Sequence, residues 1–304
     1  MDSEHAISDA QIIDVAPAIS QPIVIFAASE YSYGENGVPI SAQITLLRDI
    51  AEGDSIVTVS FPGTGTATAG NDYNSTVIPV TFSGNELIKT IEIPIIQDNI
   101  VELDETLELS LSAVNNAAIG SQNSSTVTIL NDDHATISIN DVAKAEGTGN
   151  GRTYYSFTVT MSNPVDVQVT FSPGIYFKDP TEAWTCITNP VGPGVPFIYA
   201  IHVSIQKDST VELDEQFLVT LSKIEASGRS IAFADNVGVG TILNDDQAII
   251  AVNAADVIEG DSGTPKMVYT VTMDNEVDVP VTAMVIAIGS DATNGVDLDP
   301  SRNA

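Results

Sequence analysis

Two nine-residue stretches carry most of the chemistry that this sequence could do. Residues 97–105 read QDNIVELDE, and residues 207–215 read KDSTVELDE. Carboxylates packed this closely repel one another unless a cation lies between them. Neither stretch contains histidine or cysteine, and hard oxygen donors favour Ca²⁺ or Mg²⁺ over transition metals. The expected chemistry is therefore the binding of a divalent cation.

Ca²⁺ fits these loops better than Mg²⁺. Ca²⁺ accepts about six to eight oxygens in a flexible geometry, which carboxylates and carbonyls from several loops can supply, whereas Mg²⁺ requires a tight octahedron and retains waters. The site is not an EF-hand, because the nearest stretch, DLDPSRN at 297–303, lacks the turn glycine. The sequence thus predicts Ca²⁺ held by several separate loops.

Composition narrows the possible partners. The 304 residues include 41 acidic and 10 basic side chains, giving a formal net charge of −31. This charge opposes binding to nucleic acid and to anionic membrane surfaces. No apolar run is long enough to span a bilayer, so we expect no membrane insertion of this segment. The single cysteine, Cys186, provides neither a disulfide framework nor a cysteine-rich zinc site.

Catalysis is not expected. The sequence has no G-x-S-x-G elbow, no glycine-rich phosphate loop after a strand, and no histidine beside a nucleophile. Paired carboxylates can hydrolyse glycosides, but here they occur in repeated copies, which suits binding modules better than one active site.

The acidic stretches belong to an internal repeat. TVTILNDDHATISIN at 126–140 is echoed by VGTILNDDQAIIAVN at 239–253, and Asp54, Asp166 and Asp278 lie 112 residues apart. We predict an N-terminal lead-in at 1–21 and three repeats, named unit one (22–133), unit two (134–246) and unit three (247–304). Unit three ends before its VELDE, so we expect its apolar face to be uncovered. NDDHATISI joins units one and two without a flexible linker.

The elements that must position the acids are short strands. IVTVSF, KTIEIPII and ETLELSLS alternate apolar and polar residues, and Gly, Asn, Asp and Pro turns separate them. Seven or so such strands per unit predict an all-β fold of tandem immunoglobulin-like antiparallel β-sandwiches. Alternate loops meet at one end of a sandwich. At that end of unit one, the loops would bring together Glu35, Asp72, Asp98, Glu102, Asp104, Glu105, Asp132 and Asp133.

These motifs resemble the Calx-beta domain, a Ca²⁺-binding sandwich of sodium–calcium exchanger regulatory loops, an integrin tail and bacterial surface proteins. The matching features are the Glu of GENG, the DY of AGNDYNST, the D-x-I-x-E-x-D-E stretch and TILNDD. In unit one the resemblance implies carboxylate ligands from Glu35, Asp72, Asp98, Glu102, Glu105, Asp132 and Asp133, and a backbone carbonyl from Ile100. Gln97 and Asn131 stand where the family's fullest sites have acids, which implies fewer or weaker ions.

Unit two is expected to form a partial site. The retained acids are Glu146, Asp208, Glu212, Glu215, Asp245 and Asp246. KDPTEAWTCITNPVGPG replaces the DY loop, and Asp179 or Glu182 could substitute for its aspartate. In unit three, Glu259 and Asp297 match Glu35 and Asp72 but cannot close a site without the missing half.

Structural roles compete with metal binding at several positions. The NDD pairs could be simple turn formers, and Asp104 and Asp214 could be solvated or could accept loop amides. Tyr73 is expected in the core, and Trp184 is expected to pack. Asp54, Asp166 and Asp278 are interpreted as turn residues away from the acidic loops.

The resulting hypothesis is a non-enzymatic Ca²⁺-binding tandem module that stiffens its domain junctions. We expect it to be part of a larger surface, adhesion or membrane-associated protein, located outside the cell or at its surface, with a cytosolic loop of a membrane protein as the alternative. Calcium is the expected partner, with protein or carbohydrate surface ligands in addition. The competing hypothesis is a metal-independent structural or adhesive spacer whose acids only solvate the surface.

Overall fold

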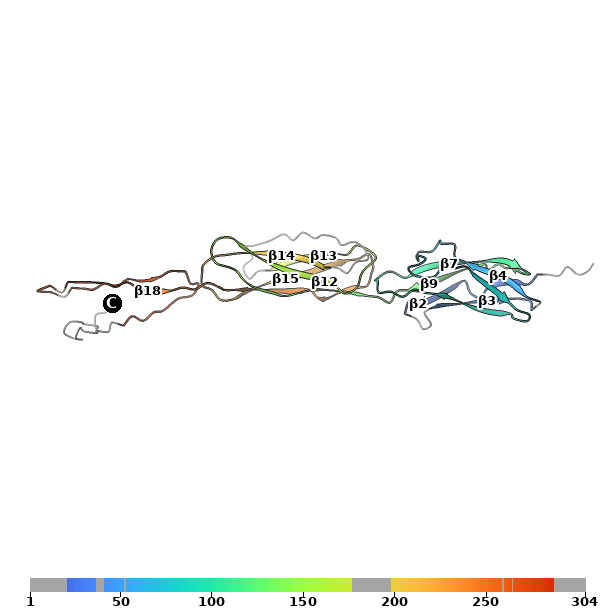
Figure 1. Cartoon of the computed structure of the whole chain (residues 1–304), viewed down its shortest axis with the longest axis horizontal. Coiled ribbons are helices and arrows are strands. Elements are labelled where there is room, and N and C mark those ends of the chain that lie inside the picture. The colour runs from blue at the N-terminus through green and yellow to red at the C-terminus, as the bar shows by residue number, and fades with distance from the viewer. Residues whose placement is uncertain are drawn as a thin grey trace, which may run out of the picture.

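The fold is described by a computed structural model, which covers residues 21–36, 41–51, 53–176, 198–258, 260–263 and 265–286. These residues form strands and turns and contain no helix, so the predicted all-β class is confirmed. Figure 1 shows three bodies in a line, formed in turn by the residues of units one, two and three.

The strands of unit one form two facing sheets. One sheet has the strand order β6-β3-β1-β8, and the other has the order β2-β9-β7-β4-β5. The strands are β1 (Ile23–Phe26), β2 (Glu30–Gly34), β3 (Ser41–Arg48), β4 (Ser55–Ser60), β5 (Ile78–Phe82), β6 (Ile88–Pro94), β7 (Glu105–Asn115), β8 (Ala118–Ile119) and β9 (Ser124–Leu130). The number exceeds seven because the first strand region divides between the sheets and β8 is a two-residue strand.

The core of unit one lies between these sheets. Strand β4 alternates buried and half-buried residues, as a strand with one face in the core should. Tyr73 is 3% exposed and packs against Phe61, with ring centroids 5.5 Å apart. The predicted core role of Tyr73 is thus seen in the structure, and it fixes the neighbouring Asp72 at the rim of the core.

Unit two repeats this arrangement. Its sheets have the orders β14-β12-β10-β16 and β11-β17-β15-β13. The strands are β10 (Ala135–Ile139), β11 (Val142–Ala145), β12 (Arg152–Met161), β13 (Thr170–Tyr176), β14 (Ile198–Gln206), β15 (Glu215–Glu225), β16 (Ile231–Asp235) and β17 (Val237–Leu243). Asp179, Glu182 and Trp184 lie outside the described residues.

Aromatic rings fill the core of unit two. Tyr155 and Phe157 each meet Phe217 edge to face, with centroids 5.6 Å and 5.8 Å apart. Gly240 lies opposite Phe217 on the paired strand, and a Cβ atom there would come within 2.2 Å of the ring. The ring therefore requires glycine at position 240.

The junction between the two units is a direct backbone connection. Val101 belongs to the acidic loop of unit one, yet its side chain is fully buried in the core cluster of unit two, together with Val165. Its N–H donates to the Pro164 carbonyl (2.9 Å), and its carbonyl accepts from the Asp166 N–H (3.3 Å). Val211 makes the corresponding pair of bonds with residues 276 and 278 of unit three.

The described part of unit three has a single pair of strands. β18 (Ile250–Val252) pairs antiparallel with β19 (Val271–Met273). Apolar side chains are left in solvent, including Ile258 at 91% and Met284 at 82% exposure. Glu259 and Asp297 lie outside the described residues.

Candidate metal centre

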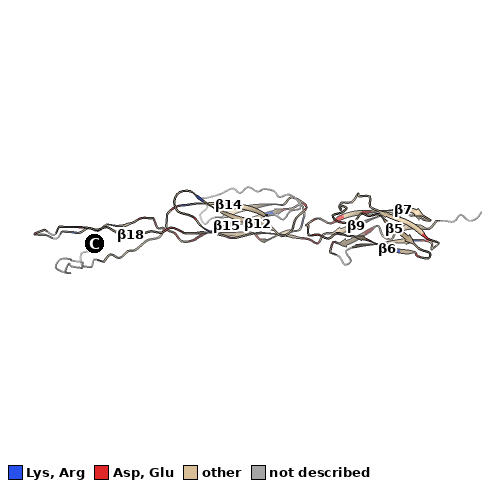
Figure 2. Cartoon of the chain, in the orientation of Figure 1, with Lys and Arg blue, Asp and Glu red and all other residues tan. Residues whose placement is uncertain are grey.

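The acids of unit one gather where its strands end nearest unit two. Glu35 follows β2, Asp98 follows β6, Glu105 begins β7, and Asp133 follows β9. Figure 2 shows acidic residues at this end of the body, beside β9, where the chain passes toward unit two. Parallel pairing of β2 with β9 and antiparallel pairing of β7 with β9 bring these loop positions together, although up to 98 residues separate them in the sequence.

A first cluster consists of Glu35, Asp98 and Asp133. Each offers a carboxylate oxygen, and the three oxygens lie within 4.8 Å of one another. Glu35 is only 6% exposed, and Oδ2 of Asp133 is buried without a hydrogen-bond partner. Leaving a buried carboxylate oxygen unpaired is costly. A cation at this position would satisfy it.

A second cluster consists of Asp72, Glu102 and Glu105, again with one oxygen from each within 4.8 Å of the others. Asp72 is 8% exposed, and its Oδ2 accepts a hydrogen bond from the Thr68 N–H. The Asp72 carboxyl also shares a hydrogen bond with Glu105. Two clusters in one unit offer places for more than one ion.

Without metal, these clusters retain protons. Burial, followed by repulsion from neighbouring carboxylates, raises the pKa of Glu35 to about 7 and that of Glu102 to about 7. Burial and then the hydrogen bond with Asp72 raise the pKa of Glu105 to about 8. The missing positive charge is thus partly replaced by protons near neutral pH.

Other predicted ligands of unit one lie beside the clusters. Asp132 is exposed and accepts a hydrogen bond from Asn36, and it belongs to neither cluster. The N–H of Ile100 donates to Oδ1 of Asp98 at 2.7 Å, while a role for the Ile100 carbonyl remains a prediction. Asp104 accepts the Asn131 N–H at 3.1 Å, so of its two suggested roles the amide contact is the one found.

The Asn131 side chain forms hydrogen bonds with backbone groups of the acidic loops. Its side chain accepts the Glu102 N–H at 3.4 Å and donates to the Asp133 carbonyl at 3.1 Å. Asn244 makes the matching contacts with Glu212 (3.1 Å) and Asp246 (3.2 Å) in unit two. The asparagine oxygen thus links the two acidic loops, and its N–H₂ group donates within its own loop, a bond that a carboxylate could not make.

Among the described residues of unit two there is one cluster, formed by Glu146, Asp245 and Asp246 within the same 4.8 Å limit. Glu146 is 4% exposed, Asp246 is 5% exposed, and Oδ2 of Asp246 has no hydrogen-bond partner. Oδ1 of Asp245 accepts the Gly147 N–H at 3.0 Å. Burial, with repulsion from Asp208 next, raises the pKa of Glu146 to about 7.

The remaining predicted ligands of unit two stay outside that cluster. Oδ1 of Asp208 accepts the Thr210 N–H at 2.8 Å. Glu215 begins β15 and is exposed, and burial raises the pKa of Glu212. A second cluster like that of unit one would need an acid at the position of Asp72, and this position falls in 177–197, outside the described residues.

The junction brings in acids whose role the sequence interpretation missed. Asp166 and Asp278 were expected to lie away from the acidic loops, and this is wrong. Asp166 raises the pKa of both Glu102 and Glu105, and Asp278 raises that of Glu212, in each case behind larger contributions. The reason is that Val101 and Val211 dock beside these aspartates. Their spacing was visible in the sequence, but their proximity across the junction was not.

Arg229 of unit two places a positive charge at the same junction. Its Nε donates to Oδ1 of Asp166 at 2.8 Å, and its Nη2 donates to Oδ2 at 2.5 Å. It also lowers the pKa of Glu102 against the stronger effects that raise it. The second cluster of unit one is therefore bordered by an ion pair of the next unit.

Comparison with known proteins identifies the family of this chain. The Calx-beta domain model matches residues 19–133 and 192–256, more than half of the chain, so the chain belongs to the Calx-beta family. One solved structure among the similar proteins is described as the calcium binding domain CBD12 of CALX1.1. Membership of this family, expected from the motifs, is confirmed.

Three similar proteins illustrate the relationship. Sodium/calcium exchanger 1 of Rattus norvegicus is 34% identical over 133 residues, covering 38% of this chain and 14% of that protein. The apo-form Calx CBD1 domain is 22% identical (38% of this chain, 100% of that one, TM-score 0.35). CBD12 from CALX1.2 is 14% identical (72% of this chain, 99% of that one, TM-score 0.35). The chain thus spans a small part of the curated relatives that it matches.

Proposed function

We propose that this chain is a non-enzymatic Ca²⁺-binding tandem module. Unit one would bind Ca²⁺ at its two clusters, and unit two would bind at a single, poorer site. The observation that carries the proposal is the pair of buried, unpartnered oxygens, Oδ2 of Asp133 and Oδ2 of Asp246, each inside a cluster of three carboxylates. All the donors are oxygens, which suits Ca²⁺.

Ion binding would change the charge balance of the loops. In the metal-free protein, carboxylates from several loops face one another and share protons. Bound Ca²⁺ supplies the positive charge that these carboxylates lack, and the protons are released. Because the clusters exist only in the folded state, Ca²⁺ at a hundredfold above its dissociation constant would stabilise that state by about 2.7 kcal/mol.

The same event would stiffen the junction. Asp98 and Glu102 lie in one loop with Val101, whose side chain is buried in the core of unit two, and Glu105 begins the strand that follows this loop. A cation that fixes the carboxylates would also fix the segment that joins the units. Support comes from Asp166 and Arg229, which bring charges of unit two to the second cluster.

The setting of the module is also proposed. The exchanger relatives favour a cytosolic regulatory segment of a larger membrane protein. None of these relatives supports the extracellular location that was expected first. The described residues form no helix suited to crossing a membrane. Protein or carbohydrate surface ligands are proposed as additional partners. In the alternative function, a metal-independent spacer, none of the clusters would bind an ion.

Thermal unfolding of the full chain separates the two functions. The midpoint should rise from EGTA through a Ca²⁺ series and should change little with Mg²⁺. The triple variant Glu35→Gln, Asp98→Asn, Asp133→Asn should lose much of the rise, while Glu225→Gln, an exposed acid outside the clusters, should keep it. An equal response to Ca²⁺ and Mg²⁺ in all three proteins would favour the spacer.

A further inference from the structure

One turn of unit two places an asparagine between glycines. Residues 147–151 read GTGNG and lie between Glu146 and β12. Gly149 and Gly151 have φ angles of 82° and 137°, which other residues rarely adopt. A Cβ atom at Gly149 would meet no other atom within 4 Å, and both Asn150 and Gly151 are exposed. The turn around Asn150 is therefore open to water.

Hydrogen bonds fix the backbone of this turn but leave two of its groups free. The Gly149 N–H donates to the Asp208 carbonyl at 2.7 Å, and the Gly151 carbonyl accepts the Lys207 N–H at 3.0 Å. Within the described part of the chain, the Gly151 N–H donates no hydrogen bond and the Asn150 side chain has no hydrogen-bond partner. The side-chain amide of Asn150 and the next backbone nitrogen are thus both unprotected.

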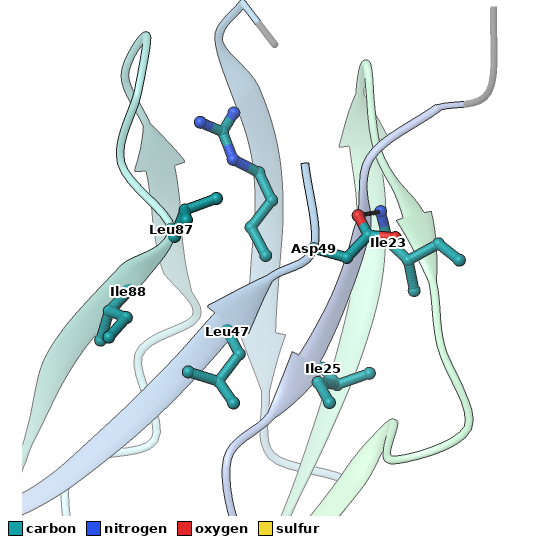
Figure 3. Close-up of a pocket in the computed structure, with 7 residues that line it drawn as sticks. Ile23, Ile25, Leu47, Asp49, Leu87 and Ile88 are labelled. Atoms are coloured by element: carbon teal, nitrogen blue, oxygen red, sulfur yellow. Dashed lines mark hydrogen bonds between the residues drawn. The ribbon is translucent and has the colours of Figure 1, made fainter. Parts of the chain in front are cut away.

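Comparable polar side chains in other turns are held in place. At the rim of an apolar hollow on unit one, Oδ1 of Asp49 accepts the Ile23 N–H at 2.6 Å (Figure 3). Asn36 also precedes a glycine in the sequence, and its side chain donates to Oδ2 of Asp132. Of the two described asparagines that precede a glycine, Asn150 is the one without such a bond.

An asparagine followed by glycine can react with its own backbone. The Gly151 nitrogen, after losing its proton, attacks Cγ of Asn150, and the absence of a Cβ atom on glycine leaves this approach unobstructed. The new N–Cγ bond closes a succinimide ring, and the Cγ–Nδ2 bond breaks with release of ammonia. Water then opens the ring. Cleavage of the N–Cγ bond leaves aspartate, and cleavage at the backbone carbonyl leaves isoaspartate, in which the chain runs through Cγ.

We propose that Asn150–Gly151 is a site of covalent self-modification, at which the exposed turn converts Asn150 into aspartate and isoaspartate. The reaction consumes only water and involves no oxidation or reduction. Each conversion adds a negative charge to the turn that begins at Glu146, beside the acidic cluster of unit two. Isoaspartate also inserts a methylene group into the backbone between the bonds of Gly149 and Gly151, which should weaken them.

Peptide mapping by mass spectrometry tests the proposal in the purified full chain. Cleavage after Lys144 and Arg152 releases residues 145–152, in which Asn150 is the one side-chain amide. During several weeks at neutral pH in EGTA, this peptide should gain the mass difference between a hydroxyl and an amino group. Fragmentation should identify part of the product as isoaspartate. The peptide that contains Asn36 should convert several-fold more slowly, because its amide is engaged.

Two variants make the result decisive. Asn150→Gln keeps the amide but requires a larger ring, so its peptide should keep its mass. Asn150→Asp adds the charge without the methylene group, so amide exchange at Gly149 and Lys207 should stay slow in this variant and become faster in the isoaspartate fraction of the aged chain. An unchanged mass of the Asn150 peptide would overturn the proposal. A rate for Asn150→Gln equal to that of the unmodified chain would overturn it as well.

Discussion

Single carboxylates decide how the metal-free module responds to pH. Burial, and then neighbours of like charge, raise the folded-state pKa values of Glu35, Glu102 and Glu105 to about 7, 7 and 8, well above the ordinary 4.5. The folded state therefore binds more protons than the unfolded state between these values. By linkage, the free energy of unfolding must fall as pH rises through this range.

This gives a prediction with a definite sign. In EGTA, the contribution of these protonated glutamates is fully present below about pH 4.5 and is lost as pH rises toward about pH 8. The unfolding midpoint of unit one should thus be higher at pH 5.5 than at pH 8. Saturating Ca²⁺ should remove most of this difference, because it displaces the protons from the folded state at both pH values. Calorimetry at the two pH values, with and without Ca²⁺, measures both effects.

The matched control for the pH effect is Glu35→Gln with Glu105→Gln. Removing two of the raised pKa values should flatten the EGTA profile between pH 5.5 and pH 8. A profile as steep as that of the unmodified chain would show that other groups carry the dependence.

At the scale of strands, two paired core positions have side chains of different size in units one and two. Leu107 faces Val127 across β7 and β9, and Phe217 faces Gly240 across β15 and β17. The larger ring in unit two is matched by the loss of a side chain opposite. Cores of constant volume tolerate such paired exchanges better than single ones.

Gly240→Val alone should therefore destabilise unit two, since a Cβ atom would lie 2.2 Å from the Phe217 ring. Overpacking of this kind costs about 1–3 kcal/mol or more. Adding Phe217→Leu rebuilds the pair found in unit one and should recover much of the loss. Denaturant unfolding of the single and double variants measures it. If the double variant is no more stable than Gly240→Val alone, the two positions do not compensate.

Much of the arrangement of strands and loops was predictable from the sequence. Period-2 alternation indicated the strands, and repeated VELDE and NDD motifs indicated loops that meet at one end. The sequence did not show the division of the first strand region into β1 and β2, because that depends on which sheet each half pairs with. It likewise did not separate Asp133, whose oxygen is buried, from its exposed neighbour Asp132.

At the scale of the whole molecule, the junction between units one and two is the main feature that links the two units. The sequence indicated a short connection but not that Val101 leaves its own unit to fill the core of the next. Nor did it show that Asp166 and Arg229 would border the acidic loop, because contacts between repeats leave no periodic signal within one repeat. The structure therefore ties the loop of one unit to the stability of its neighbour.

Val101→Ala tests this coupling. Loss of the buried side-chain atoms should lower the stability of unit two by about 1–3 kcal/mol, although the substitution lies in unit one. Val211→Ala is the matched control, because it alters the next junction, and Val211 is only partly buried. Denaturant unfolding followed by amide exchange of β12 and β15 reports unit two directly. Unchanged exchange in unit two would contradict the coupling.

The central claim is that clusters with buried, unpartnered oxygens bind Ca²⁺, and calorimetric titration of the full chain with Ca²⁺ tests it most directly. We predict saturable binding, with an affinity that Asp133→Asn lowers tenfold or more, a loss of about 1.4 kcal/mol. Asp246→Asn should remove only a weaker phase, and Glu225→Gln should change nothing. Absence of saturable Ca²⁺ binding, or equal isotherms for Asp133→Asn and Glu225→Gln, would contradict the account.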